Sequence, residues 1–265
     1  MNSIILSSGL REIVKFLVQN KLVDAVVSTA GGIEEDLMKC VDPFKLGDFE
    51  MPGYDLRGKG WNRNGNIIIE TYTYLRTSNL LMPILDEMLE EQKSKGTVWS
   101  PSTLIAKLSS GMGNETSVCY WAAKNNIPVY CPAIVDGGMG ESLLMHTVGN
   151  PGLKLDVVQD HVNLSQVIKD SYKTAGLIIG GGVPKHMILN AQRGGLNHAV
   201  FINTAQEFDG SDSGARPDES VGWGEIHPEA TPIKLFAEAS LVFPLIVAKT
   251  FVPYLQKIKN GRILI

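Results

Sequence analysis

The chain has 265 residues, of which 44% are hydrophobic and 20% charged, and this composition is typical of one sizeable globular domain with a buried core. A formal net charge of −4 and an isoelectric point near 5.8 give no basic surface, so nucleic acid is not an expected partner, whereas a cationic small molecule is. Three cysteines without CxxC spacing or neighbouring histidines predict no metal site and favour a reducing, cytoplasmic setting.

The first forty residues predict a helix, a short strand and a second helix. Apolar residues recur at helical spacing over residues 10–18, and the apolar run at residues 25–27 predicts a buried strand. This strand leads into the TAGG segment at residues 29–32, and the helix that follows is expected to carry the acidic residues 34–36 in its first turn. Such a strand, glycine turn and helix can bring backbone N–H groups close to a phosphate.

The same alternation returns along the chain. Short apolar runs at residues 127–130, 177–179 and 199–202 each precede a loop rich in glycine or acidic residues, and helical segments are expected at residues 118–124 and 183–192. Apolar runs separated by helices are typical of parallel strands. We therefore predict an α/β fold with a doubly wound, mainly parallel sheet in a single domain over residues 1–265. Glycine-rich turns after separate strands should meet at one edge and form a dinucleotide cleft.

Two segments depart from this pattern. Residues 43–76 are rich in Gly, Asn, Arg and Tyr and are interpreted as a long excursion over the surface. Residues 239–248 form the longest uncharged apolar stretch, but it includes Pro244 and has about half the length of a membrane span. No membrane association is expected.

The most informative segment is the acidic, glycine-rich loop NTAQEFDGSDSGARPDESVGWG at residues 203–224. Carboxylates at Asp209, Asp212, Asp218 and Glu219 can each meet an ammonium group, and the indole of Trp223 can attract cations and cover methylenes. The loop therefore predicts a site for a polycation.

Other charged residues are expected near the same edge of the sheet. His186 follows the triple glycine 180–182 at the start of a helix and is a candidate base, since imidazole titrates near neutral pH. Asp136 and Glu141 also follow a strand, where like charges repel unless a cation is present. A divalent metal is the alternative to a polyamine, although no spacing matches a hard-metal loop.

From about residue 7 to residue 251 the chain resembles the deoxyhypusine synthase family. The resemblance rests on the blocks TAGGIEEDLMKC, LRGKG, NRNGN, LMPILDEM, GGGVPKH, NTAQEFDGSDSGARPDE and SLVFPL. It implies a Rossmann-like domain that assembles as a tetramer with sites between paired subunits. It also implies an NAD-dependent transfer of the aminobutyl group of spermidine, through an enzyme lysine, to a lysine of the precursor of the hypusine-containing translation initiation factor.

The resemblance also implies which residues would form the sites. His186 would transfer protons. The NAD site would be lined by Ser7, Thr29, Ala30, Gly31, Glu35, Asp136, Thr204, Glu238 and Ala239. The spermidine site would be lined by Glu34, Glu141, Gly181, His186, Asn190, Gly210, Ser211, Asp212, Glu219 and Trp223.

The chain departs from the family at several of these positions. Ile4 replaces an asparagine that contacts NAD, and Glu141 and Glu238 replace aspartates. Glu225 stands where the family has the lysine that forms the covalent imine, and a carboxylate cannot form a Schiff base. The sequence begins about where the family's NAD contacts begin, without the N-terminal extension that covers a neighbour's site in the family, so we expect either a divergent paralogue or a protein of which part is missing.

These departures lead to three hypotheses. The first is a catalytically impaired partner or regulatory subunit, in a homo- or hetero-tetramer with a lysine-bearing paralogue. The second is an active enzyme, either a deoxyhypusine synthase with a changed mechanism or a homospermidine synthase. The third is a folded but functionless product.

Overall fold

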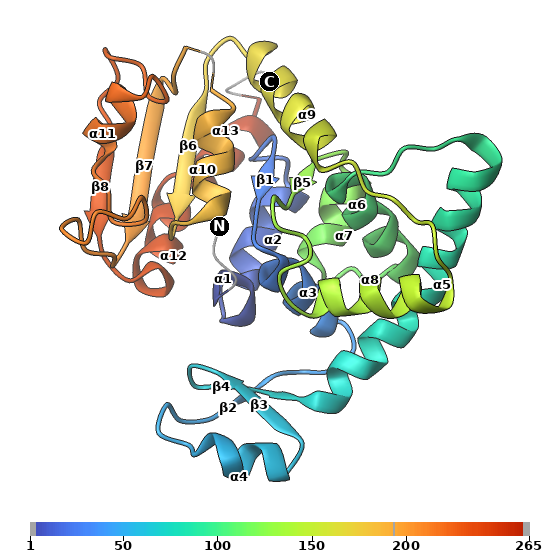
Figure 1. Cartoon of the computed structure of the whole chain (residues 1–265). Helices are drawn as coiled ribbons and strands as arrows, with labels where there is room; N and C mark the ends of the chain where they lie inside the picture. Colours follow the sequence, from blue (N-terminus) through green and yellow to red (C-terminus); the bar gives the residue numbers. More distant parts are fainter. Residues whose placement is uncertain (1–3, 193, 262–265) are drawn as a thin grey trace.

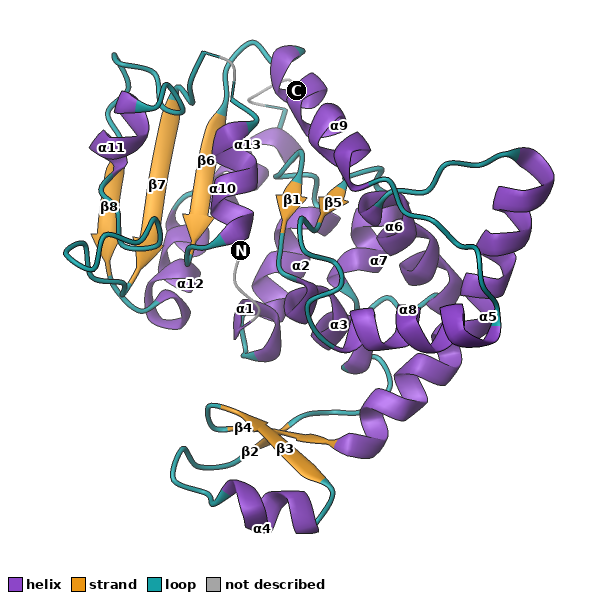
Figure 2. Cartoon of the chain, in the orientation of Figure 1, coloured by secondary structure: helices purple, strands orange, loops and turns teal. Residues whose placement is uncertain are grey.

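The computed structural model describes residues 4–192 and 194–261 and has a mixed α/β architecture (Figure 1). Two small parallel sheets and an antiparallel sheet are connected and covered by helices (Figure 2). Helices form about half of the chain: α1 Ile4–Ser7, α2 Arg11–Gln19, α3 Ala30–Met38, α4 Gly53–Gly58, α5 Thr71–Lys95, α6 Pro101–Met112, α7 Val118–Lys124, α8 Gly138–Gly149, α9 Val157–Lys169, α10 Val183–Asn190, α11 Pro217–Gly222, α12 Ala239–Lys249 and α13 Phe251–Lys259.

The parallel strands fall into two groups. Strand β1 (Val26–Val27) pairs with β5 (Val129–Tyr130), and β6 (Ala175–Ile179), β7 (His198–Asn203) and β8 (Ile233–Phe236) form a second sheet in that order. The predicted parallel sense is confirmed. The strands do not form the single continuous sheet that was expected. Helix α10 packs against β1 and β5, where Met187 and Ala191 share a buried cluster with Val27 and Tyr130.

The main hydrophobic core lies around the N-terminal helices. The predicted amphipathic helix is α2, which buries Val14, Leu17 and Val18 against α1, α3, α6 and α7. Helix α6 begins with a capping box in which Ser100 accepts from the backbone of Thr103 and the Thr103 side chain accepts from Ser100 N.

Helix α3 begins earlier than expected. The Thr29 side chain caps it by accepting a hydrogen bond from Gly32 N at 3.2 Å, so both glycines of the TAGG segment lie inside the first turn. The prediction that Glu34, Glu35 and Asp36 occupy the first turn is therefore wrong, and these carboxylates lie about one turn further along.

A buried ion pair joins three of the core helices. The Asp36 carboxylate is fully buried and accepts from Arg11 Nε at 2.7 Å. It also accepts from the Ser117 hydroxyl at 2.6 Å and from the backbone N–H groups of Val118 and Cys119 at 3.1 and 2.9 Å. One carboxylate thus neutralises the α2 guanidinium and caps the first turn of α7.

Residues 43–76 are a surface excursion, as expected, but they have regular structure. Strands β2 (Lys45–Leu46), β3 (Trp61–Asn64) and β4 (Ile67–Glu70) form an antiparallel sheet in the order β2-β4-β3, with α4 beside it. This unit, residues 45–70, protrudes below α1 and α3 in Figure 1 and is called the arm. Ile68 and Ile69 are buried within it.

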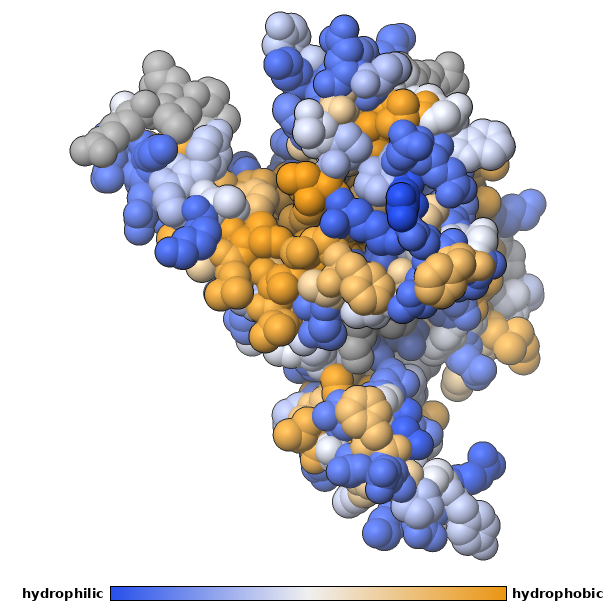
Figure 3. Space-filling view, turned by 90° about the vertical axis from the view of Figure 1, so that its left-hand side faces the viewer, coloured by the Kyte–Doolittle hydropathy of each residue, from blue (hydrophilic) through white to orange (hydrophobic). Residues whose placement is uncertain are grey.

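The C-terminal helices leave apolar surface exposed. In the described part of the chain, Ala239–Lys259 is the one helical stretch long and apolar enough to cross a bilayer, by length and composition alone, and 11% of its most apolar window is buried. Figure 3 shows apolar surface on the β8 side of the molecule. Exposed apolar residues on β8 and α12 include Ile233, Phe236, Leu241 and Leu245. The absence of membrane association stays a prediction.

Replacing Asp36 with asparagine should destabilise the fold strongly, because it leaves the Arg11 guanidinium, 7% exposed, without its counter-ion. We expect the free energy of unfolding to fall by about 3–5 kcal/mol. Urea denaturation followed by circular dichroism measures this change.

Glu12→Gln is the matched control, since it breaks the solvent-facing Glu12–Lys15 pair on α2 and should cost under about 1 kcal/mol. Equal losses for the two variants would contradict the role given to Asp36.

Candidate functional site

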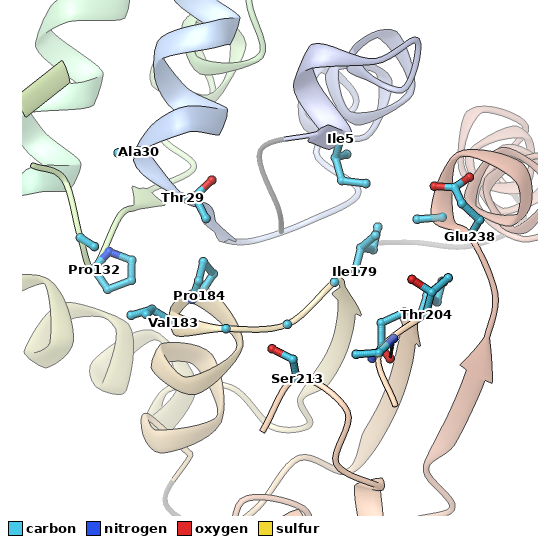
Figure 4. A pocket seen from close by; sticks show the side chains of 18 of the residues that line it. Ile5, Thr29, Ala30, Pro132, Ile179, Val183, Pro184, Thr204, Ser213 and Glu238 are labelled. Atoms are coloured by element: carbon cyan, nitrogen blue, oxygen red, sulfur yellow. Dashed lines mark hydrogen bonds between the residues drawn. The ribbon is translucent and has the colours of Figure 1, made fainter. Parts of the chain in front are cut away.

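A cavity of about 430 Å³ lies where the C-terminal ends of both parallel sheets meet. Figure 4 shows its walls, with Thr29 and Pro132 from the β1–β5 side, Thr204 and Glu238 from the β7–β8 side, and the glycine turn after β6 between them. Strand ends of this kind are where open α/β sheets bind ligands. Residues that follow separate strands meet at this edge, as predicted, but among the predicted glycine turns only residues 180–182 line the cavity.

The triple glycine forms one wall of this cavity. Gly180 and Gly182 have φ angles of +84° and +71°, a region that side chains disfavour. A Cβ atom at Gly181 would lie 2.6 Å from the Ser213 hydroxyl and 2.7 Å from its backbone. The turn can therefore pass under the acidic loop only with glycine at position 181.

Six of the predicted cofactor residues line the cavity and three do not. Gly31 follows Ala30 inside α3 without reaching the cavity wall, and Ser7 and Glu35 are buried beneath that wall, where the Ser7 hydroxyl donates to Glu35 Oε2 and Asn64 Nδ2 donates to Glu35 Oε1 at 2.6 Å. The side chain of Ile4 lies outside the described residues. The cavity is lined by Thr29, Ala30, Asp136, Thr204, Glu238 and Ala239.

Glu238 has a structural role as well. It is the N-cap of α12, where its carboxylate accepts from the Ser240 hydroxyl and from Leu241 N. The Ser240 hydroxyl bond holds the pKa of Glu238 below its usual value. The cavity wall therefore carries an anionic group whose position is fixed by the helix it caps.

Glu34 lies at the opposite side, below the Asp136 loop. Its Oε2 accepts a hydrogen bond from Met139 N at 2.8 Å, so it provides an acceptor for a backbone N–H group in the first turn of α8. A Cβ atom at Gly137, which has a φ of +120°, would lie 2.8 Å from the same carboxylate oxygen. Burial raises the pKa of Glu34 to about 7, and the charges of Glu35 and Asp136 contribute to the increase.

The acidic loop is held from below by a buried lysine. Lys185 Nζ donates to the backbone carbonyl of Asp212 at 2.5 Å, lies 3.3 Å from Asp212 Oδ1 and lies over the Phe201 ring at 4.7 Å. His186 Nε2 is 3.2 Å from the other carboxylate oxygen, Oδ2. The structure therefore brings His186 and Asp212 together, as predicted for two residues of one site.

The remaining residues that were predicted to bind the substrate are spread further apart around the cavity. Gly181 lines the cavity, whereas Trp223 is 78% exposed at the C-cap of α11 and does not reach it. Glu34 lies beneath α8. The others are exposed outside the cavity: Glu141, Asn190, Gly210, Ser211 and Glu219.

Glu225 follows α11 and is anchored through its backbone. Its N–H donates to Ser220 O and its carbonyl accepts from Leu196 N, both at 2.9 Å. Among the described residues it lines neither this cavity nor a second one, of about 600 Å³, between α11 and β8. Asp218 and Lys234 line that second cavity, and Lys234 Nζ donates to Gly214 O.

Several residues of the cavity wall were not predicted. Ser213 lies against Gly181, and nothing in its local sequence distinguishes it from Ser211 and Ser220 of the same loop. The others lie at or near the end of a strand or at the start of a helix, a signal that could have selected them. They are Ile5, Pro132, Ala133, Ile179, Val183, Pro184, Ile202, Asn203, Ala205 and Ala237.

No cluster of His, Cys, Asp and Glu within residues 4–192 and 194–261 has the arrangement of a metal site. The carboxylates near the cavity are dispersed over α3, the Asp136 loop, the acidic loop and α12. Such a distribution suits an extended cation better than a compact one.

Comparisons with known proteins agree on one family. A family profile described as deoxyhypusine synthase matches residues 1–250. Deoxyhypusine synthase of Senecio vernalis is 52% identical over 252 residues, which cover 93% of this chain and 68% of that protein. Homospermidine synthase 2 of the same plant is 50% identical over 253 residues, with the same coverage. The crystal structure of an Entamoeba histolytica protein, provisionally assigned as a deoxyhypusine synthase, matches with a TM-score of 0.69 at 34% identity, covering 95% of this chain and 73% of that one.

Glu34→Gln should reduce the pH dependence of stability. The pKa of Glu34 is about 7 in the folded protein against an ordinary value of 4.5, so the folded state binds more protons between these two pH values. The free energy of unfolding of the wild type therefore falls by on the order of 3 kcal/mol as the pH rises through this window. Urea denaturation at pH 5 and pH 8 should show the variant gaining stability relative to wild type at pH 8.

The control for the loss of one negative charge is Glu141→Gln, which removes an exposed carboxylate from the first turn of α8. If Glu34→Gln and wild type lost equal stability between pH 5 and pH 8, the burial assigned to Glu34 would be wrong.

Proposed function

The chain belongs to the deoxyhypusine synthase family, and from this premise we propose that it binds the ligands of that family but cannot complete aminobutyl transfer with its own residues. In this proposal it acts as a partner or regulatory subunit of a lysine-bearing paralogue. The single observation that carries the proposal is Glu225, which stands where the resemblance expects the lysine that forms the imine.

The chemistry of position 225 supports impairment. Covalent transfer needs a neutral amine that attacks an imine carbon and then releases the aminobutyl group. A carboxylate has no nitrogen with which to form that bond. The backbone bonds of Glu225 to Ser220 and Leu196 do not depend on its side chain, so the fold tolerates the replacement.

The neighbouring lysines are engaged elsewhere. Lys185 is 2% exposed, and its ammonium group is bound to Asp212 and covered by Phe201. Lys234 donates to the carbonyl of Gly214. Among the described residues no lysine lines the cavity. These contacts support the view that no other amine replaces the missing nucleophile.

The cavity fits a dinucleotide. A Cβ atom at Gly182 would meet no protein atom within 4 Å, and the first residues of α3 and α10 line the cavity, so backbone N–H groups can meet a pyrophosphate. Thr29, Thr204 and Asp136 offer hydroxyl and carboxylate groups to ribose hydroxyls. When bound, NAD supplies the hydride acceptor that oxidation of an amine requires.

The acidic groups in and near the cavity support binding of spermidine. Asp136 lines the cavity and Asp212 directly precedes the wall residue Ser213, whereas Glu34 and Glu219 lie outside the cavity. His186, paired with Asp212, can accept a proton from the amine and return it, with the carboxylate stabilising the imidazolium. Binding and proton transfer therefore use side chains that this chain retains.

An active enzyme is the second candidate. The homospermidine synthase of Senecio vernalis is as similar to this chain as the deoxyhypusine synthases are, at 50% against 52% identity. Overall similarity thus does not separate a protein lysine from a small diamine as acceptor. This candidate requires an amine other than residue 225 to form the covalent intermediate.

The exposed apolar surface supports assembly with another subunit. Ile233, Phe236, Leu241 and Leu245 are each more than half exposed on neighbouring elements. A patch of this kind is typical of an interface. We propose a homo- or hetero-tetramer in the cytoplasm, with spermidine and the precursor of the hypusine-containing initiation factor as its further partners.

The proposal predicts that only Glu225→Lys yields a covalent adduct. The protein is incubated with NAD and spermidine, any imine is reduced with borohydride, and the intact mass is measured. Wild type should give no aminobutyl adduct, because no free amine is positioned to attack. Glu225→Lys should give one.

Glu229→Lys is the matched control, since it adds a lysine at an exposed position four residues further along and should remain unmodified. Recovery of an aminobutyl adduct on any lysine of the wild type would refute impairment and favour the active enzyme.

A second prediction concerns mixed assembly. Adding this chain to a lysine-bearing paralogue should give more deoxyhypusine than the same amount of paralogue alone, because a subunit without the nucleophile can still contribute its cofactor-binding residues to a shared site. Light scattering of the mixture should show a complex larger than either monomer. A monomeric chain together with unchanged product formation would end the partner hypothesis.

A further inference from the structure

The arm contacts helix α3 through a side-chain amide. Asn64, the last residue of β3, donates from Nδ2 to Glu35 Oε1 at 2.6 Å. Ser7, the last residue of α1, donates its hydroxyl to Glu35 Oε2. Each oxygen of this carboxylate therefore has a donor from a different element, one of them outside the helical core.

Glu35 is sensitive to the loss of either donor because it is 2% exposed. Burial raises the pKa of Glu35, while hydrogen bonds from Ser7 and Asn64 and the charge of Lys39 lower it. The other titratable groups that face it are Glu34 on the same helix and Tyr74 on α5. A buried carboxylate oxygen that lacks a hydrogen-bond donor destabilises the folded protein more than an exposed one does. Removal of the Asn64 amide therefore favours the protonated form of Glu35.

The contact lies directly behind the cavity wall. Ile5, two residues before Ser7, and Ala30, five residues before Glu35, both line the cavity. Ser7, Glu35 and Asn64 thus form a chain of hydrogen bonds that joins the α1–α3 edge of the cavity to the arm. A change in these hydrogen bonds alters the spacing between α1 and α3, the two helices whose ends form that edge.

We propose that Asn64 is a positioning residue, which holds the Glu35 carboxylate between α1 and α3 and makes the arm part of the support for dinucleotide binding at that edge. The inference deepens the proposed function and rests on its assignment of this edge to NAD. Asn64 itself is placed behind the wall and does not touch the ligand.

The test compares three single variants. Asn64→Leu removes the donor while keeping the branched shape and the number of side-chain heavy atoms, and Asn64→Asp is isosteric but adds a carboxylate. Asn62→Leu is the matched control, because Asn62 lies on the same strand and donates its amide to the Thr71 hydroxyl at 2.9 Å, away from Glu35. Two quantities are measured: the titration of the Glu35 carboxyl carbon by NMR, assigned with Glu35→Gln, and the affinity for NAD at pH 6 and pH 8.

Asn64→Leu should move the Glu35 titration to higher pH and weaken NAD binding about tenfold. Asn64→Asp should weaken binding more at pH 8 than at pH 6, because at the lower pH the two adjacent carboxylates share a proton that restores a donor to Glu35. Asn62→Leu should change neither quantity. Asn64→Asp also serves as the test if the leucine variant fails to fold.

The two readouts separate the possible failures. An unchanged Glu35 titration in Asn64→Leu and Asn64→Asp would overturn the positioning role, whatever happens to NAD affinity. A shifted titration in a protein whose wild type binds no NAD would support the positioning of Glu35 and refute the proposed cofactor site.

Discussion

Three consecutive carboxylates on helix α3 hold the core of this protein together. Successive helical residues point about 100° apart, so Glu34, Glu35 and Asp36 reach different neighbours. Glu34 caps α8, Glu35 binds Ser7 of α1 and Asn64 of the arm, and Asp36 pairs with Arg11 of α2 while capping α7. One turn of helix thereby fixes the elements around it, and its own N-terminus becomes a rigid part of the cavity wall.

This arrangement explains why an acidic run lies inside a buried helix. Each carboxylate replaces its hydration with donors from backbone N–H groups, hydroxyls, an amide or a guanidinium, which is the condition for burying such groups. The Asp36 network is the most complete, with a charged partner and three further donors. Glu34 has backbone donors, and its burial raises its pKa to about 7.

Sequence patterns predicted the local elements better than their assembly. The runs that became β6, β7 and α7 were predicted within about two residues, because apolar strands and helical periodicity depend on neighbouring residues. The sequence analysis missed β8, whose pairing with β7 joins residues distant in the chain, and it also missed the arm strands, although β3 and β4 form a local hairpin. The acidic run in α3 was interpreted as a first turn near a ligand, since its partners Arg11, Ser117 and Asn64 lie far away in sequence.

The candidate site was predicted where it is built from turns and less well where it depends on packing. Glycines at 180–182 and the residues after β1 and β7 follow from local rules, whereas Ser213 enters the wall because Gly181 has no side chain. Position 225 shows the converse. Its backbone joins Ser220 and Leu196, and Ile226 beside it is fully buried, so the segment keeps its place with any side chain there. Because these contacts are made by the backbone, the architecture does not depend on which side chain occupies the position on which the proposed impairment rests.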